Sequence, residues 1–559
     1  GAMNDRDAQM YWRVIRGGFI IHREHKILDF QWLGLDADEV RGQAWDRAGN
    51  KGSWVTYTFS VTANEDANWV AYVDTTGNDT TGDGSEESPW ATVTKAVTEA
   101  QSALTSGQVG VIFLSDDQTW AHTATLYSGG DATSRLVRFV RKGGGTAKPI
   151  LTFSAGTTGF FVGKRGALHL EGLDIRGDHS ASSYGEAISI GRSGGVAADR
   201  DPYNLMVVDC EFDEWWQDIK SSDSVGFADR DTGCLDFVAL QGVSFLGSRE
   251  YHVFGLDYCQ RILVSGCWFG PSDIDGSAWN NPFRVYGIGR SLFADNVFQT
   301  GDNGSLRILV ASTDPSANVR YVNIVRHHHT HGITFGPDPS TAGAVYINDV
   351  RIVDCRFEAG TAINIRADDV SSNGVYTERF DVMECSAYDT NLLVVGGSSS
   401  VTHVNSSIRI RGCASSNGYG GGQFIRINGS SARYAAGCFE IHACGHIWDT
   451  ADNPEPRFFL KAEGMTRADL IARISVCDYN YIAKADADAT DWARGSDGSI
   501  NLAAWRTESG FDANSSVNLN STLNVTNTGV SVPANGDYRL ASDSGPLAGT
   551  GYPLPLGVS

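Results

Sequence analysis

Short stretches in which apolar and polar residues alternate recur along most of the chain. Examples are "LHLEGLDIRG" at residues 168–177, "RYVNIV" at 320–325 and "FRVYG" at 283–287. A period of two is typical of a strand that buries one face, whereas a helical unit needs about 10 to 15 residues with a period near 3.6. No such helical pattern is visible between about residues 145 and 490. The pattern therefore predicts an all-β region built from many short strands.

The strands belong to a repeat of about 30 residues, which emerges when segments such as "VVDCEF" (207–212) and "IVDCRF" (352–357) are aligned. One aligned column contains, at spacings of 24 to 33 residues, Cys210, Val243, Cys267, Asn296, His327, Cys355, Cys385, Cys413, Cys444 and Cys477. Two residues farther on, a second column contains Phe212, Phe245, Phe269, Phe298, His329 and Phe357. A repeat of this length made of strands indicates a solenoid.

The fold that fits is a right-handed, single-stranded parallel β-helix of about 10 to 12 coils. Each coil packs only on its neighbours, so the architecture escapes the size limit of a single globular core. Equivalent residues on adjacent coils then lie about 4.8 Å apart. The cysteine column becomes an inner ladder of small apolar side chains. We expect these cysteines to stay free thiols, since parallel Cβ vectors do not suit a disulfide.

The first 66 residues follow a different pattern. The stretch "EVRGQAWDRAGNKGSWVTYTFSV" (39–61) resembles the last strands of an immunoglobulin-like or fibronectin-like module, with a turn at 46–52. We therefore divide the chain into a small, β-sandwich-like module at 1–66 and a β-helix domain, caps included, at 67–559. The module's role is expected to be that of a spacer or an edge cap.

Both ends of the β-helix region resemble the pectate-lyase-like superfamily. The opening segment is "YVDTTGNDTTGDGSEESPWATVTKAV" (72–97), in which a Gly- and Asp-rich turn leads into an amphipathic capping helix. The closing segments are "LAAWRTESGFDANS" (502–515) and "GDYRLASDSGPLAGTG" (536–551). The resemblance, over about residues 70 to 555, implies a capped parallel β-helix. Its activity stays open, because the superfamily includes lyases, hydrolases, epimerases, tailspikes and binding proteins.

The formal net charge of −22 argues against a nucleic-acid partner, because phosphate binding needs a basic surface. No apolar run of about 18 residues predicts a membrane span, so no membrane partner is expected. The resemblance implies a secreted, extracellular protein or one on a virion surface. Its oligomeric state is open: a monomer, or a trimer if it is similar to tailspikes.

Four histidines fall within five positions of "VNIVRHHHTHGITFG" (322–336). In the repeat register His327 takes the cysteine position and His329 the phenylalanine position, so both are expected to point inward. His328 and His331 are expected to face outward and to contact substrate. Because the four imidazoles do not converge on one point, no metal site is predicted here.

Cationic side chains recur at outward positions of the second strand in each coil. Lys220, His252, Arg284 and Arg307 occupy four consecutive coils, and Asp218 is also expected to face outward. In an acidic protein such a stripe concentrates positive potential and attracts an anionic ligand. Adjacent like charges repel, so this arrangement is not explained by stability.

These residues favour β-elimination on a uronate-containing polysaccharide. Arg284 and Arg307 would neutralise the uronate carboxylate, and Lys220, His252 and Tyr286 would serve as base or acid. The residues expected to bind substrate are Trp268, Trp279, His328, His331 and Arg366. Similar β-helix lyases act with or without Ca²⁺, so a Ca²⁺ cofactor is left open and none is firmly predicted.

Two alternatives remain. A glycoside hydrolase or tailspike-like depolymerase needs a pair of carboxylates, and the candidate acids are Asp257, Asp273, Asp275 and Asp302. A glycan-binding or adhesin rod needs no catalytic group at all. The insertions at 271–281 and 223–233 are expected to wall the groove in each of these cases.

Overall fold

The computed structural model describes four strands before residue 60 and most of the chain between 67 and 519. The described residues are 9–16, 19–25, 39–45, 55–58 and 67–519, except for 106–107, 130–135, 163–166, 179–184, 191–203, 222–236, 256–258, 260, 272–281, 290, 300–305, 311–318, 330, 338–343, 359, 367–373, 388–389, 397–402, 406, 418–422, 449–457, 479 and 485–491.

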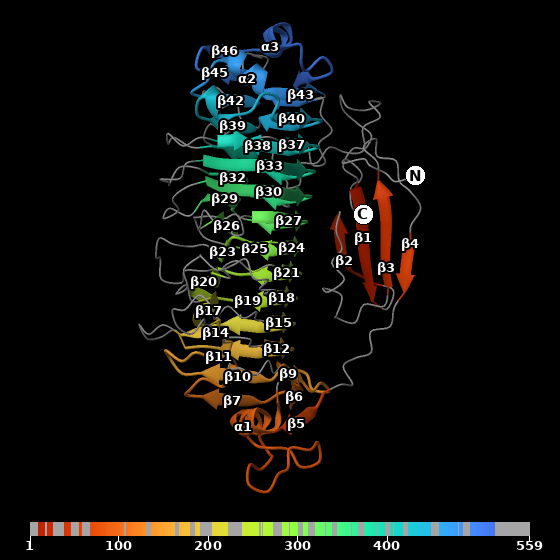
Figure 1. Ribbon diagram of the computed structural model, residues 1–559, viewed down its shortest axis with the longest axis vertical. Helices are drawn as coiled ribbons and strands as arrows, with labels where there is room; N and C mark the ends of the chain where they lie inside the picture. The colour runs from red at the N-terminus through yellow and green to blue at the C-terminus, as the bar shows by residue number, and fades with distance from the viewer. Residues whose placement is uncertain are drawn as a thin grey trace.

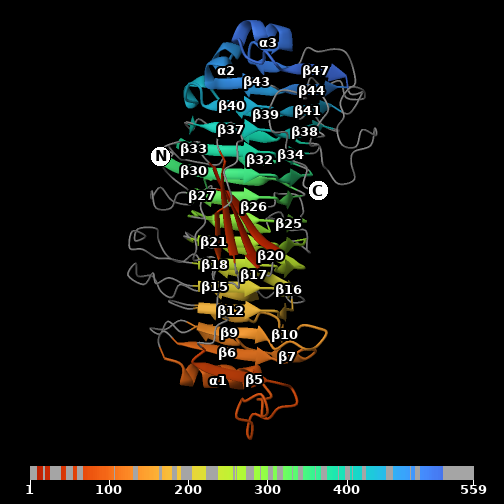
Figure 2. The same ribbon diagram turned by 90° about the vertical axis from the view of Figure 1, so that its right-hand side faces the viewer.

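Three long sheets run the length of a right-handed parallel β-helix (Figures 1 and 2), which confirms the predicted fold. Sheet 1 consists of β5 Trp69–Val73, β6 Val109–Leu114, β9 Leu136–Arg141, β12 Ala167–Glu171, β15 Asn204–Val208, β18 Phe237–Gln241, β21 Arg261–Ser265, β24 Ser291–Ala294, β27 Val319–Val325, β30 Ala344–Val353, β33 Gly374–Met383, β36 His403–Asn405, β37 Ile408–Arg411, β40 Phe439–His442 and β43 Ile474–Asp478. Sheet 2 consists of β7 Thr119–His122, β10 Ile150–Phe153, β13 Asp174–Arg176, β16 Glu211–Asp213, β19 Ser244–Phe245, β22 Trp268–Phe269, β25 Val297–Phe298, β28 His328–His329, β31 Arg356–Phe357, β34 Ser386–Ala387, β38 Ala414–Asn417, β41 Gly445–Trp448, β44 Tyr481–Lys484 and β47 Ser516–Leu519. Sheet 3 consists of β8 Tyr127–Gly129, β11 Phe160–Val162, β14 Glu186–Ile190, β17 Trp215–Ser221, β20 Ser248–Gly255, β23 Phe283–Tyr286, β26 Leu306–Val310, β29 Ile333–Pro337, β32 Ile363–Ile365, β35 Leu393–Val395, β39 Ile425–Asn428, β42 Leu460–Glu463, β45 Ala493–Gly495 and β46 Gly498–Ile500.

The described sheets contain 15, 14 and 14 strands, so the solenoid has more rungs than the 10 to 12 coils expected from the repeat. The extra rungs come at the start, where the marker residues are absent. Leu173, for example, takes the cysteine position ahead of β13, and it is fully buried. An aliphatic residue fills the interior as well as a cysteine does, but it leaves no visible column in the sequence.

The corner between sheets 1 and 2 explains why Asp or Gly so often precedes the ladder position. Residues such as Asp209, Asp295 and Asp354 adopt positive φ values of 50°, 56° and 53°. Gly242 and Gly266 do the same at 60° and 63°. Asp and Gly tolerate this left-handed conformation better than most residues, so the corner selects them on coil after coil.

The inner ladder forms as predicted, with one exception at its end. The cysteine thiols donate to the carbonyl two residues earlier, as Cys385 Sγ does to Met383 O at 3.3 Å. Every cysteine in the described part of the chain is a free, buried thiol. Cys477 does not belong to the ladder, because it lies on β43 opposite Ile441. Asn480 takes the ladder position instead, and its side chain accepts a hydrogen bond from the Cys444 amide at 3.0 Å.

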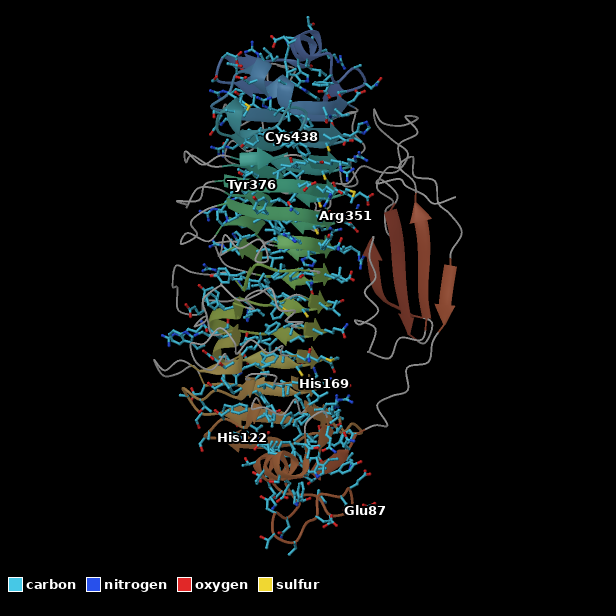
Figure 3. The ribbon with its side chains drawn as sticks, viewed as in Figure 1. Glu87, His122, His169, Arg351, Tyr376 and Cys438 are labelled. Carbon is cyan, nitrogen blue, oxygen red and sulfur yellow. The ribbon has the colours of Figure 1, made fainter. Side chains whose placement is uncertain are left out.

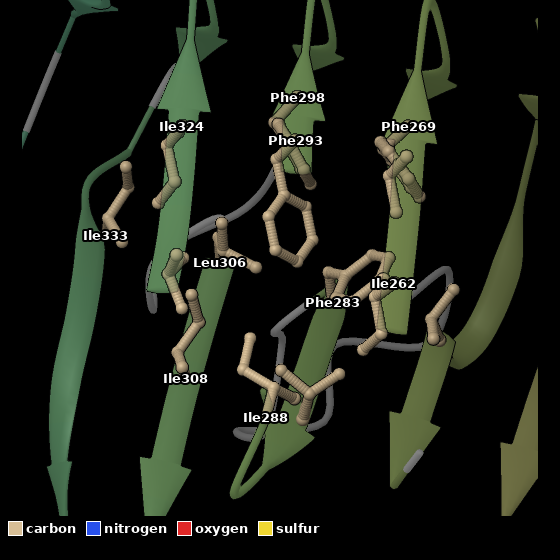
Figure 4. Packing of buried hydrophobic residues seen from close by; sticks show 14 of the residues in the cluster. Ile262, Phe269, Phe283, Ile288, Phe293, Phe298, Leu306, Ile308, Ile324 and Ile333 are labelled. Atoms are coloured by element: carbon tan, nitrogen blue, oxygen red, sulfur yellow. The ribbon is translucent and has the colours of Figure 1, made fainter. Parts of the chain in front are cut away.

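The aromatic column stacks over six successive rungs of sheet 2. Ring centroids of Phe245, Phe269 and Phe298 lie 4.9 and 4.4 Å apart with interplanar angles of 11° and 7°. His329 continues the stack between Phe298 and Phe357 at 4.8 and 5.2 Å. Phe269 and Phe298 occupy the same place on neighbouring strands in Figure 4. These centroid distances match the spacing of the strands, so parallel pairing itself holds the rings in contact.

Helices close the two ends of the solenoid in Figure 1: α1 (Val93–Ala103) at one, α2 (Arg467–Arg473) and α3 (Leu502–Ser509) at the other, with a 3₁₀ turn at Ser431–Arg433. The predicted capping helix is thus confirmed. In the opening segment, Trp90 Nε1 donates to Gly82 O at 3.0 Å. Gly84, with φ 79°, leaves room for the ring, since a Cβ there would lie 2.8 Å from it.

Asp512 is the centre of the other cap. Its carboxylate accepts hydrogen bonds from the indole nitrogens of Trp505 and Trp492 at 2.7 and 3.3 Å, and from Asn480 at 3.0 Å. Burial raises the pKa of this carboxyl. The first predicted closing segment is therefore a structural cap, while residues 536–551 lie outside the described residues.

Within the first 58 residues, β1 (Gln9–Arg16), β2 (Phe19–His25), β3 (Glu39–Trp45) and β4 (Val55–Thr58) form an antiparallel sheet in the order β2-β1-β3-β4. The antiparallel β3–β4 pair agrees with the turn expected between these segments. The likeness to immunoglobulin or fibronectin modules and the domain boundary at 66 stay predictions.

The outward face of sheet 1 carries buried side chains. Its apolar part consists of Ala239, Leu263, Leu292, Ala294 and Val325, with Met206 at the edge. Farther along, Asp381 accepts two hydrogen bonds from Arg409 at 2.6 and 2.8 Å and lies 3.5 Å from Arg351. Arg351 and His169 lie along the same long side in Figure 3. Asp381 and Arg351 on this face are buried and paired, so they do not present charge to a ligand.

The aromatic stack predicts a large loss of stability on truncation. Phe269→Ala should lower the free energy of unfolding by about 3 to 5 kcal/mol, because it removes ring contacts on both sides and leaves a cavity. Val297→Ala is the control, since Val297 lies on the adjacent strand but is 37% exposed. Its cost should stay within about 0.5 kcal/mol. Urea unfolding followed by circular dichroism measures the free energy of unfolding of both variants. Equal losses for Phe269→Ala and Val297→Ala would contradict a stabilising role of the stacked rings.

Candidate functional site

The start of each sheet 3 strand breaks the alternation of inward and outward residues. Two consecutive residues are fully buried in the core at this corner, as in Leu392 with Leu393 and Phe424 with Ile425. The first residue of each pair fills the corner between sheets 2 and 3, and the second begins the inward face of the strand. A sequence reading with a strict period of two therefore assigns the wrong face just before each strand.

This corner places Asp218 and His252 inside the solenoid, so the prediction that they face outward is wrong. Both side chains are 0% exposed. Asp218 lies between Gln217, which pairs with Glu186, and Ile219, which pairs with Ile188, and it takes the first inward position of its strand. His252 contacts the aromatic column, with its ring centroid 5.5 Å from that of Phe245.

The two buried groups form a closed hydrogen-bonded pair. His252 Nδ1 lies 2.5 Å from Asp218 Oδ2, and His252 Nε2 lies 2.9 Å from the carbonyl oxygen of Gly270. Because a carbonyl only accepts, Nε2 carries a proton. Burial raises the pKa of Asp218 to about 6, although the contact with His252 opposes this shift. His252 cannot reach a ligand on the outer face and is a structural residue.

The predicted column of outward cations is present on sheet 3, except that one of its four members is a different residue. Parallel pairing of β17, β20, β23 and β26 stacks Lys220, Phe254, Arg284 and Arg307 in one outward column. Phe254 thus takes the place expected for His252. The column continues along sheet 3 through Thr334, Asn364, Val394, Arg426, Lys461 and Arg494. None of these positions carries a carboxylate.

Aromatic side chains surround Arg284. Its guanidinium carbon lies 5.6 Å from the Phe254 ring centroid and 5.1 Å from that of Tyr286, which is two residues on along the same strand. Tyr251 packs on Phe254 at 4.7 Å. Burial raises the pKa of Tyr251, while Arg284 and Arg307 favour its ionised form. The arrangement joins two adjacent cations to phenolic groups that can transfer protons.

Two carboxylates border this part of the column, and sequence reasoning missed both. Glu186 Oε1 lies 3.1 Å from Lys220 Nζ. Glu250 Oε2 accepts hydrogen bonds from Gln217 Nε2 at 2.5 Å and Trp216 Nε1 at 3.0 Å. Glu186 comes immediately before the buried pair Ala187 and Ile188, and Glu250 comes two residues before His252, where alternation fails. The paired Leu-Leu or Phe-Ile residues that start other sheet 3 strands are the sequence signal that could have located them.

The histidine cluster divides as predicted. His327 and His329 are buried, with 1% and 0% of their surface exposed. His328 lies on the outer face of sheet 2, where Nε2 contacts Glu358 Oε1 at 2.5 Å. His331 lies three residues before Thr334, the residue that pairs with Arg307. His331 therefore precedes β29 on the rung of Thr334, one rung beyond Arg307, whereas His328 is on another sheet.

An interior hydrogen-bond chain fixes the proton positions of the buried histidines. The Cys267 amide donates to Asn296 Oδ1 at 2.8 Å, which orients the Asn296 side chain so that Nδ2 donates to His327 Nε2 at 3.0 Å. His327 Nδ1 then donates to His329 Nε2 at 3.2 Å. Burial lowers the pKa of His327 to about 3 and that of His329 well below its usual value. Both rings are neutral parts of the core.

The remaining substrate-binding candidates lie in different places. Trp268 is on the outer face of sheet 2, and its ring covers Gly270 at the corner, where a Cβ would lie 2.6 Å from it. Arg366 follows β32, and its backbone amide donates to Phe335 O at 2.8 Å. Its Cβ lies near Gly336, so it occupies the outward column that begins with Tyr286. Arg366 thus lies in the outward column next to the cationic column of sheet 3. Trp268 lies on sheet 2, next to the corner that leads to sheet 3.

Several candidates lie outside the described residues. These are Trp279, Asp257, Asp273, Asp275 and Asp302, together with most of the two insertions expected to wall a groove. Within the described residues no three His, Cys, Asp or Glu side chains are grouped closely enough to hold a metal ion. No helix in this part of the chain is long and apolar enough to cross a membrane.

No protein-family profile and no curated protein matches this chain. Among solved structures, the GH136 lacto-N-biosidase from Eubacterium ramulus is similar at 10% identity with a TM-score of 0.30, over 71% of this chain and 67% of that one. The catalytic domain of a GH87 α-1,3-glucanase in complex with nigerose is similar at 11% identity and a TM-score of 0.22, over 92% and 84%. The GH87 α-1,3-glucanase from Streptomyces thermodiastaticus gives 10% and 0.24, over 92% and 86%. Likeness at this level carries no conclusion about activity.

The buried pair predicts a pH dependence of stability. Because the pKa of Asp218 rises from 3.8 to about 6 on folding, the folded state holds a proton in this window that the unfolded state has released. The contribution of Asp218 to the free energy of unfolding therefore falls as the pH rises through this window. Asp218→Asn keeps a hydrogen bond to His252 and removes this titration.

The measurement is the urea midpoint of both proteins across the same pH series. The stability of Asp218→Asn relative to the unmodified protein should increase from the lower to the upper end of the window. Glu87→Gln, which removes an exposed carboxylate, is the control and should show no such trend. Parallel curves for Asp218→Asn and the unmodified protein would contradict a buried, perturbed carboxyl.

Proposed function

We propose that this protein binds a uronate-containing polysaccharide on the outer face of sheet 3 and cleaves it by β-elimination. The observation that carries the proposal is the direct pairing of Arg284 with Arg307 on adjacent rungs, beside the phenol of Tyr286. Two neighbouring guanidinium groups match the charge and planar geometry of a carboxylate. In a chain of net charge −22 this column is a local exception that favours an anionic ligand.

The residues divide the reaction between them. Arg284 and Arg307 neutralise the uronate carboxylate and stabilise the enolate that forms when the neighbouring carbon loses its proton. Tyr286 is the proton-transfer group, because it lies within reach of the same carboxylate position as Arg284. Tyr286, acting as the phenolate, takes the proton from this carbon, the electron pair of the broken C–H bond forms a C=C bond, the glycosidic C–O bond breaks, and the Tyr286 phenol returns the proton to the leaving oxygen.

Other groups support binding rather than chemistry. Lys220 is two rungs from Arg284, about 10 Å away, so it contacts a neighbouring sugar. Phe254 between them offers an apolar ring face on which a sugar stacks. His331 lies just before β29, one rung beyond Arg307. Membership of the pectate-lyase-like superfamily and secretion belong to the same proposal, supported by the sequence resemblance alone, and a Ca²⁺ requirement is left open.

The test is ultraviolet absorbance of the new double bond, conjugated to the carboxylate, during incubation with a panel of uronate-containing polysaccharides. Activity is expected, and Arg284→Ala should reduce it about 100-fold or more, because a preorganised charge partner is lost. Lys142→Ala is the control, since Lys142 forms an exposed ion pair with Glu86 far from this face. A parallel series with EDTA reports on Ca²⁺. If no polymer in the panel yields an unsaturated product, elimination is ruled out as the reaction.

Hydrolysis is the second candidate, favoured by Glu186 and Glu250. Their strands β14 and β20 are two rungs apart, about 10 Å in strand spacing, which is near the upper end of the carboxyl separation used for two-carboxylate hydrolysis. New reducing ends without ultraviolet absorbance would identify this reaction. Glu250→Gln should then lower the rate about 100-fold or more, while Arg284→Ala should mainly raise KM. Full activity in Glu250→Gln would exclude this pair.

A further inference from the structure

A second group of cations lies farther along the same outward column. Arg426, Lys461 and Arg494 pair with one another on consecutive strands β39, β42 and β45. They repeat the arrangement of Arg284 and Arg307, which lie near the middle of sheet 3, at the end that α2 and α3 close. Nothing in the sequence marks them as one unit, because 68 positions separate the first from the last.

Counted over the residues that the structure describes, the group keeps a positive charge after its ion pairs. Glu463 contacts Arg426 Nη2 and Lys461 Nζ, both at 2.7 Å. One carboxylate therefore serves two cations and leaves one positive charge. Arg494 adds another, and its guanidinium lies 5.3 Å from the Phe458 ring centroid, which gives the group an aromatic face. Glu463 offsets the repulsion between Arg426 and Lys461, whereas the repulsion of Arg494 by Lys461 on the adjacent rung is not offset by that carboxylate.

The two groups are separated by a fixed distance. Between Arg307 and Arg426 the column holds Thr334, Asn364 and Val394, so four rung spacings, about 19 Å, separate the two arginines. Arg366 is beside the middle of this interval. A ligand that contacts both groups must be an extended polymer whose anionic groups recur along its length.

We propose that Arg426, Lys461 and Arg494 form a second anion-binding subsite that holds a remote part of the same acidic polysaccharide. This inference rests on the proposed function for its ligand. Because one polymer contacts both groups, the second contact is intramolecular and raises the affinity for long chains without new chemistry. Oligosaccharides too short to span the interval contact the Arg284 group alone and gain nothing from the second subsite.

The experiment compares long and short ligands. Kd is measured by calorimetry for the intact polymer and for size-fractionated oligosaccharides, using Tyr286→Phe in all proteins so that the ligand stays uncleaved. Adding Lys461→Gln and Arg494→Gln should weaken polymer binding about tenfold or more and leave the shortest oligosaccharides unchanged. Gln keeps part of each aliphatic stem, and circular dichroism checks that the fold is retained. Lys142→Ala is the matched loss of a cation elsewhere.

The possible failures are distinct. If the polymer binds and the double variant weakens long and short ligands equally, or neither of them, the second subsite is overturned while the proposed function stands. If no uronate polymer binds the protein at all, the proposed function fails and the second subsite fails with it. A loss of affinity confined to long chains, with unchanged Kd for the shortest oligosaccharides, supports the second subsite and the binding of an acidic polysaccharide on this face.

Discussion

The structure depends on one constraint: parallel backbone pairing places every residue about 4.8 Å from its equivalent on the next coil. When the same type of side chain recurs on adjacent coils, it forms a column. The interactions between neighbouring members of the column then decide whether that residue type stabilises the fold. Phenylalanines gain from this repetition by stacking. Asparagine gains by bonding the neighbouring backbone, as Asn296 and Asn480 do. Arginines repel one another, so an arginine column needs a reason outside the fold.

The same constraint decided what could be predicted from sequence. The cysteine and phenylalanine columns were visible because large or distinctive side chains recur at inward positions, and they gave the fold and most of its register. Leu173 takes the same inward position, but a leucine is too common to reveal a repeat. The first coils were therefore left out of the number of coils expected from the sequence. Cys477 was assigned to the ladder wrongly because the last repeat, from Cys444 to Asn480, is longer than the earlier repeats. The hydrogen bond from the Cys444 amide to Asn480 identifies Asn480 as the residue in the ladder position.

The candidate site was partly predictable for a related reason. Lys220, Arg284 and Arg307 were placed on the outer face because alternation holds within a strand. Asp218 and His252 were placed there wrongly because alternation fails at the corner, where two consecutive residues turn inward. This failure also concealed Glu250. Within the run of histidines, His327 and His329 belong to the core. The side-chain amide of Asn296, rather than a metal, sets their tautomers.

The regular spacing of the rungs gives the outer face of sheet 3 the property of a ruler. Distances between two groups on one column change only in whole steps of about 4.8 Å, because a coil is gained or lost as a unit. The distance between Arg307 and Arg426 is therefore a whole number of these steps. Deletion of one coil between them would shorten the distance by one step and leave both groups of cations unchanged. A solenoid of this kind can be re-tuned for the charge spacing of another polymer by counting coils rather than by redesigning contacts.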